Sequence, residues 1–186
     1  MAKKIGFLVN SDRCIGCHAC ELACKNEYQQ EPEIRWRKVY PLKEDSFGGV
    51  AREFASLACN HCEDPACLKA CPVIAYTKRE DGIVMHSKER CIGCKNCMLA
   101  CPYKVPEFNK KTKKVEKCHM CAVRQDRGEK PACVAGCPME AISVIDITDD
   151  IAGGERSLPG FPNAAITSPT TRFIKPVVGR QVRRDA

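Results

Sequence analysis

Sixteen cysteines in four groups of four constrain this 186-residue chain more than any other feature. The first and third groups share the spacing C-x2-C-x2-C-x3-C, and the second and fourth keep the closing C-x3-C-P but widen the middle gap. At about 9% of all residues, cysteine is abundant enough to indicate a fold built around sulfur chemistry. The groups are Cys14, Cys17, Cys20 and Cys24; Cys59, Cys62, Cys67 and Cys71; Cys91, Cys94, Cys97 and Cys101; and Cys118, Cys121, Cys133 and Cys137.

Short identical segments show that the four groups are two pairs of copies. The first and third groups both begin with Arg-Cys-Ile-Gly-Cys, at 13–17 and 90–94. Pro-Ala-Cys occurs at 65–67 and at 131–133, and Cys-Pro follows each time. An internal repeat of this kind indicates that one structural unit occurs twice.

The spacing is typical of thiolate ligands to [4Fe-4S] clusters. A C-x-x-C-x-x-C loop places three thiolates around one cluster while its backbone N–H groups point at the sulfides. In two-cluster ferredoxins the fourth cysteine of such a run ligates the other cluster, and the proline that follows redirects the chain. We therefore expect all sixteen cysteines to be ligands, and four [4Fe-4S] clusters to be bound in reciprocal pairs.

Two other roles for the cysteines compete with cluster binding. Structural zinc sites use C-x-x-C pairs, but evenly spaced triple runs that close in C-x3-C-P are unlike zinc knuckles. Disulfides need an oxidising compartment, and the N-terminus lacks the pattern of a cleavable secretory signal. His18, His61 and His119 lie inside the groups. Because each cluster already has four cysteines, we expect these histidines to hydrogen-bond to sulfur or to be solvated.

The segments between the groups predict an α+β fold of short elements. Residues 5–9 predict a strand, and 21–28 predict a helix after the first group. Since only 6% of the residues are aromatic, clusters must fill much of the interior, and we expect the iron-free chain to be poorly folded. Further strands are predicted at 53–58, 83–86, 114–116 and 142–147.

Two segments outside the groups have a different character. Residues 29–50 are predicted to extend the first domain and to present a partner-facing surface, although Trp36 is equally compatible with a core position. Residues 148–186 are rich in Gly and Pro and lack periodicity. Disorder is one interpretation, and the preferred one is an extended arm across a partner subunit. Its proposed anchors are Phe161, Ile166, Phe173, Ile174, Val177 and Val178.

The net charge of +7 is compensated by the expected cofactors. Four clusters at about −2 each bring the charge to about −1, because the charge of a bound metal centre must be counted with that of its ligands. A nucleic-acid partner therefore has little support. Lys25, Lys95 and Lys104 lie near cluster cysteines in the sequence, and we expect them to raise cluster potentials.

No apolar run approaches the 18 to 20 residues, roughly, that a membrane-spanning helix needs. We expect a chain that is made in the cytoplasm without a signal or transmembrane helix of its own, so that any export depends on another protein.

Three further stretches narrow the comparison to one family. They are Cys-Asn-His-Cys-Glu-Asp-Pro-Ala-Cys at 59–67, Cys-Pro-Tyr at 101–103 with Pro106, and Lys-Cys at 117–118 before Pro-Ala-Cys. In order and spacing, residues 5–147 resemble the four-cluster iron-sulfur subunits of complex iron-sulfur molybdoenzymes, most closely those of dimethyl sulfoxide and polysulfide reductases. The segment 172–176 looks like the C-terminal end of that family.

The resemblance implies a ligand set for each cluster. In the nitrate reductase branch one cysteine of the third group is replaced by tryptophan, whereas all four are present here, so four cubane clusters are implied. The implied sets are Cys14, Cys17, Cys20 and Cys137 for cluster 1; Cys118, Cys121, Cys133 and Cys24 for cluster 2; Cys59, Cys62, Cys67 and Cys101 for cluster 3; and Cys91, Cys94, Cys97 and Cys71 for cluster 4.

The resemblance also implies two partners: a catalytic subunit with a molybdenum or tungsten bis-pyranopterin cofactor near cluster 1, and an integral membrane quinol-binding anchor near cluster 4. The subunit would lie peripherally at the membrane, on the outer face if it is exported with its partner and otherwise on the cytoplasmic face. No residue resembles a substrate catalyst, so we expect a non-catalytic electron-transfer subunit with no direct small-molecule substrate.

We therefore expect two pseudo-symmetric bacterial-ferredoxin-like domains, each with two clusters, the second inserted into the first. Domain 1 comprises residues 1–50 with 107–147, domain 2 comprises 51–106, and 148–186 form an extended partner-binding tail. The expected function is electron relay between the anchor and the catalytic subunit. The alternative is a soluble polyferredoxin-type carrier, or a relay subunit of a hydrogenase or soluble pyranopterin enzyme.

Overall fold

The computed structural model describes residues 3–42, 53–149 and 151–176, in a mixed α/β fold of short elements. The helices are α1 (Ala19–Glu27), α2 (Ala66–Lys69), α3 (Asn96–Ala100), α4 (Ala122–Asp126), α5 (Ala132–Ala135) and the 3-10 turn η1 (Ala164–Ile166). The strands are β1 (Ile5–Asn10), β2 (Lys38–Pro41), β3 (Phe54–Leu57), β4 (Tyr76–Lys78), β5 (Val84–His86), β6 (Glu107–Asn109), β7 (Lys114–Glu116), β8 (Ile142–Asp146), β9 (Gly154–Glu155) and β10 (Arg172–Ile174). These elements confirm the predicted strands and first helix within one or two residues.

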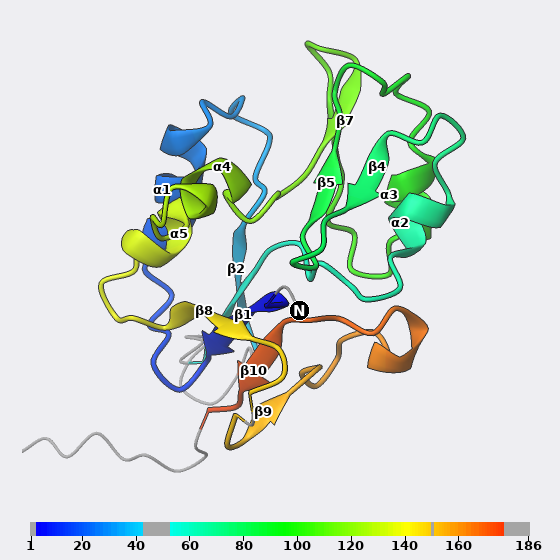
Figure 1. Ribbon diagram of the computed structural model, residues 1–186. Helices are drawn as coiled ribbons and strands as arrows, with labels where there is room; N and C mark the ends of the chain where they lie inside the picture. Colours follow the sequence, from blue (N-terminus) through cyan, green and yellow to red (C-terminus); the bar gives the residue numbers. More distant parts are fainter. Residues whose placement is uncertain (1–2, 43–52, 150, 177–186) are drawn as a thin grey trace, which may run out of the picture.

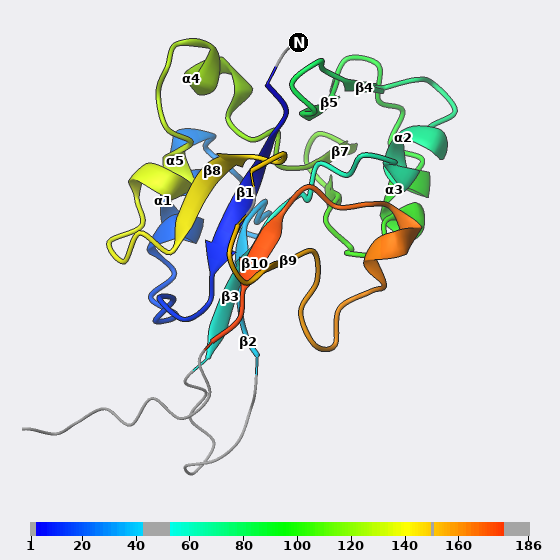
Figure 2. The same ribbon diagram turned by 60° about the horizontal axis from the view of Figure 1, so that its bottom comes forward.

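The first strand lies inside a four-stranded sheet with the order β8-β1-β10-β9. Strand β1 runs antiparallel to β8, with Val9 opposite Ile142, and parallel to β10, with Val9 also opposite Phe173. Figure 2 shows β8, β1 and β10 side by side. Phe7 and Val9 are each 1% exposed, because residues two apart in a strand point to the same face.

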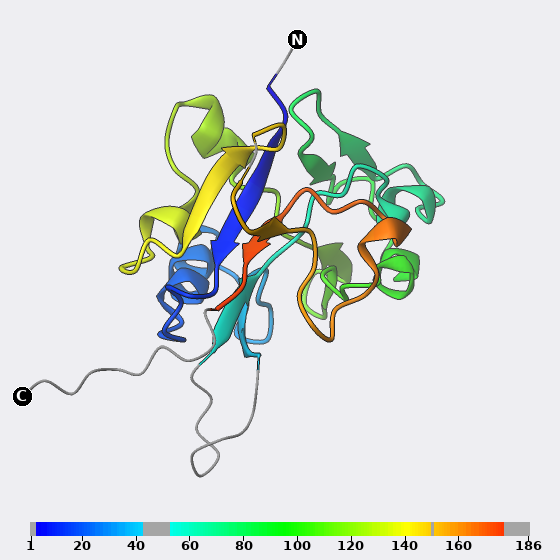
Figure 3. The same cartoon turned by 90° about the horizontal axis from the view of Figure 1, so that it is seen from below.

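Two helix pairs flank this sheet. Helix α1 packs against α5, and α2 packs against α3. Figure 1 shows α1, α4 and α5 on one side of the molecule and α2 and α3 on the other, and Figure 3 shows the sheet from below between them. A Cβ atom at Gly136 would lie 2.6 Å from Cβ of Ala23, so the close approach of α1 and α5 requires glycine at that position.

Two of the three two-stranded antiparallel sheets make contacts across the expected domain boundaries. Strand β3, expected in domain 2, pairs with β2 of domain 1. The hairpin β6-β7, expected in domain 1, buries Val115 and Phe108 in a core with Tyr76 and Cys97 of the other half. Strand pairing and side-chain packing therefore cross the boundaries expected at residues 51 and 107.

The segment 29–50 is described only up to residue 42. Trp36 is 6% exposed and packs in the main core with Phe7, Ile34 and Met120. Its ring stacks on Tyr28, with ring centroids 5.2 Å apart. Burial in the protein's own core is therefore the role of this tryptophan, and Tyr40, at 43% exposed, remains on the surface. The rest of this segment, residues 43–50, lies outside the described residues.

The C-terminal segment was expected to extend across a partner subunit, and its described part packs on its own protein. Strand β10 joins the central sheet, and Phe173 is 1% exposed in a core cluster with Val9, Ala55 and Leu158. The Thr170 hydroxyl donates a hydrogen bond of 2.8 Å to the carbonyl of Asn60. This segment folds onto its own protein because its apolar side chains complete a core that β1 and β3 leave open. Val177 and Val178 lie outside the described residues.

Replacing Phe173 by Ala should therefore lower the stability of the isolated, iron-loaded protein, at a cost of roughly 3–5 kcal/mol, which is usual for deleting a buried phenylalanine side chain. The measurement is the apparent Tm under anaerobic conditions. Ile166→Ala is the control, since Ile166 is 58% exposed and its substitution should change stability by less than about 0.5 kcal/mol. Equal effects of the two variants would contradict the packed position of β10.

Candidate cluster-binding sites

The cysteine loops of groups one and three have the same backbone conformation. Gly16 and Gly93 have φ of 71° and 72°, and His18 and Lys95, which precede α1 and α3, have φ of 60° and 66°. Groups two and four match in the same way, since His61 and Met120 both have positive φ. The repeat in the sequence is thus a repeat in backbone geometry, and each loop turns so that successive cysteines face one centre.

Glycine is required at position 93 for space as well as for its backbone conformation. A Cβ atom there would lie 2.2 Å from the carbonyl oxygen of Lys113. Gly128 also has positive φ, of 77°, but nothing lies within 4 Å of its Cβ position. An alanine at position 128 would therefore suffer backbone strain alone, whereas an alanine at position 93 would also clash with the backbone of Lys113.

Gly93→Ala is expected to disrupt the loop of group three, with loss of iron and a lower Tm. Gly128→Ala should retain all the iron, because it carries only the left-handed strain of about 1–2 kcal/mol. Iron analysis and thermal unfolding of both variants provide the check. Identical behaviour of the two variants would contradict the role of the close approach at Lys113.

Two cavities are lined by four cysteines each. One contains the thiols of Cys14, Cys17, Cys20 and Cys137, with Val39 and Ser56 in its wall. The other contains Cys59, Cys62, Cys67 and Cys101, with Lys117, Tyr103 and Thr167 in its wall. In both cavities three cysteines come from one group, and the fourth is the last cysteine of a different group.

The remaining eight cysteines also affect one another across groups. In addition to burial, the charges of Cys133 and Cys121 raise the pKa of Cys24, and those of Cys24, Cys59 and Cys133 raise the pKa of Cys118. Cys97 interacts with Cys91, Cys94 and Cys71. The structure thus brings thiols of different groups together, in two cavities with four cysteines each and in further effects of one thiol on another.

These quartets fit a polynuclear group better than a single metal ion. In the part of the sequence that the structure describes, no three His, Cys, Asp or Glu side chains converge closely enough to hold one metal ion. A zinc site needs thiolates about 2.3 Å from a common centre. The thiols line cavity walls instead, which suits the corner irons of a [4Fe-4S] cluster. When bound, such a cluster accepts and releases single electrons.

Burial favours the thiol form of these cysteines over the free thiolate. It raises the pKa of Cys24, Cys62 and Cys67 to about 12 in each case, and it raises the pKa of Cys118 as well. Cluster ligation requires thiolates, so cluster insertion releases protons from these groups. The interior thus favours metal-bound or protonated sulfur.

Backbone N–H groups donate to several of the sulfur atoms, as the loop geometry predicts. Ala75 and Ala141 occupy equivalent places in the repeat and donate to Cys71 and Cys137, both at 3.3 Å. The Met120 N–H donates to Cys118 at 3.3 Å. Such hydrogen bonds stabilise thiolate charge and tune cluster potential.

The three histidines are placed differently from one another. His61 is fully buried, with Nδ1 accepting the N–H of Val84 at 3.0 Å and Nε2 lying 4.0 Å from Sγ of Cys118. This position agrees with the expected hydrogen bond to sulfur, and it links the loop of group two to a cysteine of group four. His119 packs edge-on against Tyr28 and Trp36, and His18 is exposed beside Glu21.

The three lysines expected to tune clusters direct their ammonium groups elsewhere. Lys25 donates to three carbonyl oxygens at 2.7–3.0 Å, those of Glu31, Pro32 and Ile34. Lys95 lies over the ring of Phe108, 4.1 Å from its centroid, and Lys104 is exposed. Sequence proximity to a cysteine is a poor guide here because these loops and short helices point successive side chains in different directions.

The buried cations near the thiols are different residues, Arg37 and Lys117. Arg37 is 2% exposed and Lys117 is 3% exposed. Lys117 donates to the carbonyls of Val84 and Cys118. Ser56 and Gln30 also contact sulfur, at 3.2 Å from Cys20 and 3.3 Å from Cys24. The sequence did not predict the contacts of Ser56 and Gln30 with sulfur. These contacts depend on how β2, β3 and the segment after α1 fold over the cysteine loops.

The geometry thus defines a ferredoxin-type iron-sulfur protein, and comparisons with known proteins agree. The 4Fe-4S dicluster domain model matches residues 50–147, and the 4Fe-4S binding domain model matches residues 7–27. The sixteen cysteines fit four [4Fe-4S] clusters. Among the described residues, no helix has the length and apolarity that crossing a membrane requires.

Curated relatives define the family more closely. The protein is 40% identical over 186 residues to the B chain of anaerobic dimethyl sulfoxide reductase from Escherichia coli (strain K12), covering 95% of this sequence and 90% of the relative. It is 30% identical to the arsenate respiratory reductase iron-sulfur subunit ArrB of Shewanella sp. (strain ANA-3), covering 78% and 83%. The B subunit of tetrathionate reductase from Salmonella typhimurium is 37% identical, covering 78% and 59%. This protein belongs to the family of dimethyl sulfoxide reductase iron-sulfur subunits, whose members serve electron transport in reductase complexes.

Proposed function

We propose that this protein relays electrons through four [4Fe-4S] clusters between a membrane quinol-interacting anchor subunit and a molybdopterin catalytic subunit of a respiratory oxidoreductase. The observation that carries the proposal is the exchange of fourth thiols between groups, which links the quartets in two reciprocal pairs. The similarity to reductase iron-sulfur subunits supports the same conclusion. The protein itself is non-catalytic in this proposal, and the catalytic partner selects the substrate.

The proposed ligand sets follow the quartets. Cluster 1 is held by Cys14, Cys17, Cys20 and Cys137; cluster 2 by Cys24, Cys118, Cys121 and Cys133; cluster 3 by Cys59, Cys62, Cys67 and Cys101; and cluster 4 by Cys71, Cys91, Cys94 and Cys97. Support comes from the two four-cysteine cavities and from the electrostatic contacts among the other thiols.

We further propose that clusters 1 and 2 lie in one ferredoxin-like domain and clusters 3 and 4 in a second, inserted domain. The packing of α1 on α5 and of α2 on α3 supports this division. In this arrangement the hairpin β6-β7 belongs to the second domain and β3 to the first. His61 joins the two, since it neighbours Cys62 of cluster 3 and approaches Cys118 of cluster 2.

Exposed apolar side chains favour a fixed subunit over a soluble carrier. Ile15 and Leu22 are 57% and 59% exposed near Cys17, and their repeat equivalents Ile92 and Leu99 are 63% and 87% exposed near Cys94. Cys17 and Cys94 are the two exposed cysteines among the sixteen, all of which are described. Apolar surface of this kind marks interaction sites. We propose that clusters 1 and 4 are the two ends of the relay, each covered by a partner.

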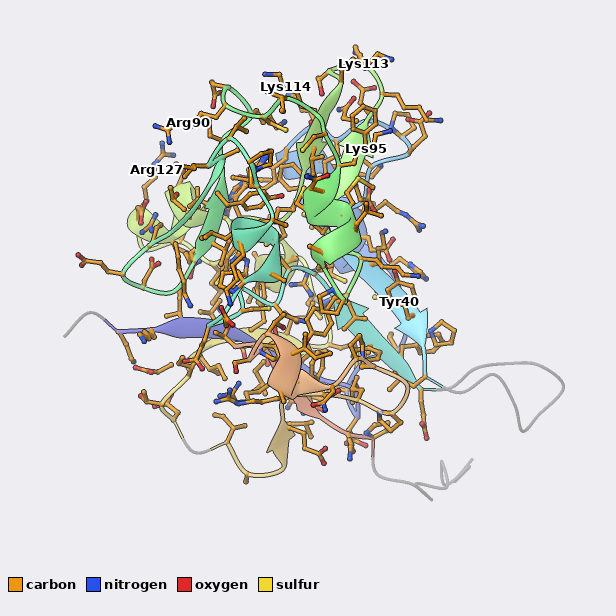
Figure 4. The ribbon with its side chains drawn as sticks, turned by 90° about the vertical axis from the view of Figure 1, so that its right-hand side faces the viewer. Tyr40, Arg90, Lys95, Lys113, Lys114 and Arg127 are labelled. Atoms are coloured by element: carbon orange, nitrogen blue, oxygen red, sulfur yellow. The ribbon has the colours of Figure 1, made fainter. Side chains whose placement is uncertain are left out.

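The end of the relay at cluster 4 carries several cationic side chains. Figure 4 shows Arg90, Lys113 and Lys114 at the end of the molecule where hairpin β6-β7 lies. Nη1 of Arg90 lies 3.5 Å from the carbonyl of Ile74, a residue that is itself 68% exposed. An apolar centre with a cationic rim fits a protein partner with an acidic surface. On the resemblance, the complex is peripheral at the membrane, on its outer face through co-export with a partner.

The test is native anaerobic purification followed by iron, acid-labile sulfide and metal analysis, with EPR of the dithionite-reduced protein. The proposal expects about sixteen irons per protein, four for each of four cubane clusters, together with a large partner that contains molybdenum or tungsten. Migration of the native protein at its own mass would contradict a fixed subunit and favour the soluble carrier. Four or fewer irons with stoichiometric zinc would contradict cluster binding altogether.

A further inference from the structure

Arg37, the residue directly before β2, has an unusual environment for a charged side chain. It is 2% exposed, and its guanidinium carbon lies 4.5 Å from the ring centroid of Phe7. Nη1 donates to the backbone oxygen of Ser56 at 3.2 Å and to its hydroxyl at 3.0 Å. Among the described residues, Nε and Nη2 have no hydrogen-bond partner. A buried charge without compensation is costly, so a negative group must lie nearby in the working protein.

Arg37 interacts with thiols of two proposed ligand sets. Its guanidinium donates to Ser56, whose hydroxyl oxygen lies 3.2 Å from the sulfur of Cys20. Burial lowers the pKa of Arg37, but the charges of Cys133, Cys118, Cys20 and Cys24 raise it above its ordinary value. In the proposed ligand sets, Cys20 belongs to cluster 1 and the other three belong to cluster 2, so the positive charge acts on ligands of both clusters.

Ser56 connects Arg37 directly to one of these ligands. A guanidinium only donates hydrogen bonds, so the Ser56 hydroxyl oxygen accepts from Arg37 and its own hydrogen is free to be donated. The sulfur of Cys20 lies 3.2 Å from that oxygen. The path from Arg37 through Ser56 to Cys20 thus directs positive charge and a polarised hydroxyl at a ligand of cluster 1.

We propose that Arg37 is the fixed counter-charge shared by clusters 1 and 2, and that it raises the reduction potential of both by stabilising their reduced states. Reduction adds one electron, and hence one negative charge, to a cluster without changing its ligands. A permanent positive charge at close range, in an interior that screens it weakly, favours the more negative state. Arginine suits the role because it stays protonated when buried. The inference rests on the proposed ligand sets of these two clusters.

The test compares three variants of the intact, iron-loaded complex by EPR-monitored redox titration. Arg37→Gln keeps hydrogen-bonding capacity but removes the charge, and it should shift the midpoint potentials of clusters 1 and 2 to more negative values while clusters 3 and 4 stay unchanged. Arg37→Lys keeps the charge and should return the midpoint potentials of clusters 1 and 2 most of the way to the wild-type values. Arg35→Gln is the control, because that side chain is 53% exposed and 3.8 Å from Glu21, and it should shift neither cluster.

The salt dependence of the shift distinguishes this role from a purely structural one. The shift should persist at high ionic strength, because buried charges are screened much less than exposed ones. The signals of clusters 1 and 2 are identified as those absent from Cys14→Ala and Cys121→Ala. If Arg37→Gln retains its iron and all four potentials match the wild type, the proposal is overturned, and a loss of thermal stability alone would assign Arg37 to packing.

If the Gln variant does not assemble, Ser56→Ala and Arg37→Lys are measured instead. Ser56→Ala removes the hydrogen-bonded link between Arg37 and Cys20 and should shift the potential of cluster 1 to more negative values. Arg37→Lys keeps the charge and should leave the potentials of clusters 1 and 2 close to those of the wild type. An unchanged potential of cluster 1 in Ser56→Ala would overturn the proposal. The iron content of the wild-type complex reports separately on the proposed function.

Discussion

Cys24→Ala is expected to damage the cluster held by Cys118, Cys121 and Cys133, although those three ligands lie about a hundred residues further along the sequence. In addition to burial, the charges of Cys133 and Cys121 raise the pKa of Cys24, and in the proposed ligand sets these three cysteines bind the same cluster. Loss of one ligand should release the corner iron or the whole cluster, so that the iron content falls from about sixteen to between about fifteen and twelve. Iron analysis and EPR of the reduced variant measure the effect.

The decisive comparison is between spectra of paired variants. Cys24→Ala should lose the same EPR signal as Cys133→Ala, and Cys20→Ala should lose the same signal as Cys14→Ala. Cys20 and Cys24 are both on α1 and both buried, so they are matched controls for general damage to the helix. If Cys24→Ala and Cys20→Ala lost the same signal, the reciprocal ligand sets would be wrong.

Removal of iron is expected to abolish cooperative folding of most of the protein. Eight of the sixteen cysteines are buried, several within the main core clusters, and the helices beside them span only four to nine residues. Elements this short are not stable alone, and without clusters the cavities lose their central contacts. Chelation under anaerobic conditions should therefore eliminate the thermal transition seen by circular dichroism and make the protein sensitive to proteases.

The pH dependence of the iron-free protein gives this prediction a second check. Burial raises the pKa of Cys24, Cys62 and Cys67 from 9.0 to about 12. A group whose pKa is raised in the folded state stabilises folding below its unfolded pKa, and this contribution is lost as pH rises through the folded value. Residual structure in the iron-free protein should thus decrease between pH 9 and pH 12. An iron-free protein that unfolds cooperatively at neutral pH with the wild-type Tm would contradict the dependence on clusters.

Local patterns in the sequence were sufficient for the elements next to the cysteines. The apolar run at 5–9, the copied Arg-Cys-Ile-Gly-Cys loops and the short strands before each group depend on near neighbours in the sequence, and the structure reproduces them. The positive φ of Gly16 and Gly93 belongs to the same class, because the loop conformation and the residue that permits it are encoded within a few positions.

Contacts between segments that are distant in the sequence could not be predicted from local patterns. Phe173 pairs with Val9 of β1, from the opposite end of the sequence, and its short strand has no periodicity to distinguish it from a loop. The hairpin β6-β7 joins the second half because Val115 and Phe108 fit beside Tyr76, a matter of side-chain volume. Lys25 adjoins a cysteine in sequence, yet its ammonium group donates to carbonyls.

The sequence by itself determined the cofactor class and the repeated cysteine loops of this protein, because thiolate spacing within a loop must match the corners of one cluster. Only the tertiary structure decided how distant segments pack together and where the buried cations lie. Arg37 shows why: its neighbours Phe7, Ser56 and Cys133 come from different elements. The guanidinium is held by the packing of β1 and β3 over the cysteine loops, and the electrostatic effect of a charge depends on such distances in space rather than on separation along the sequence.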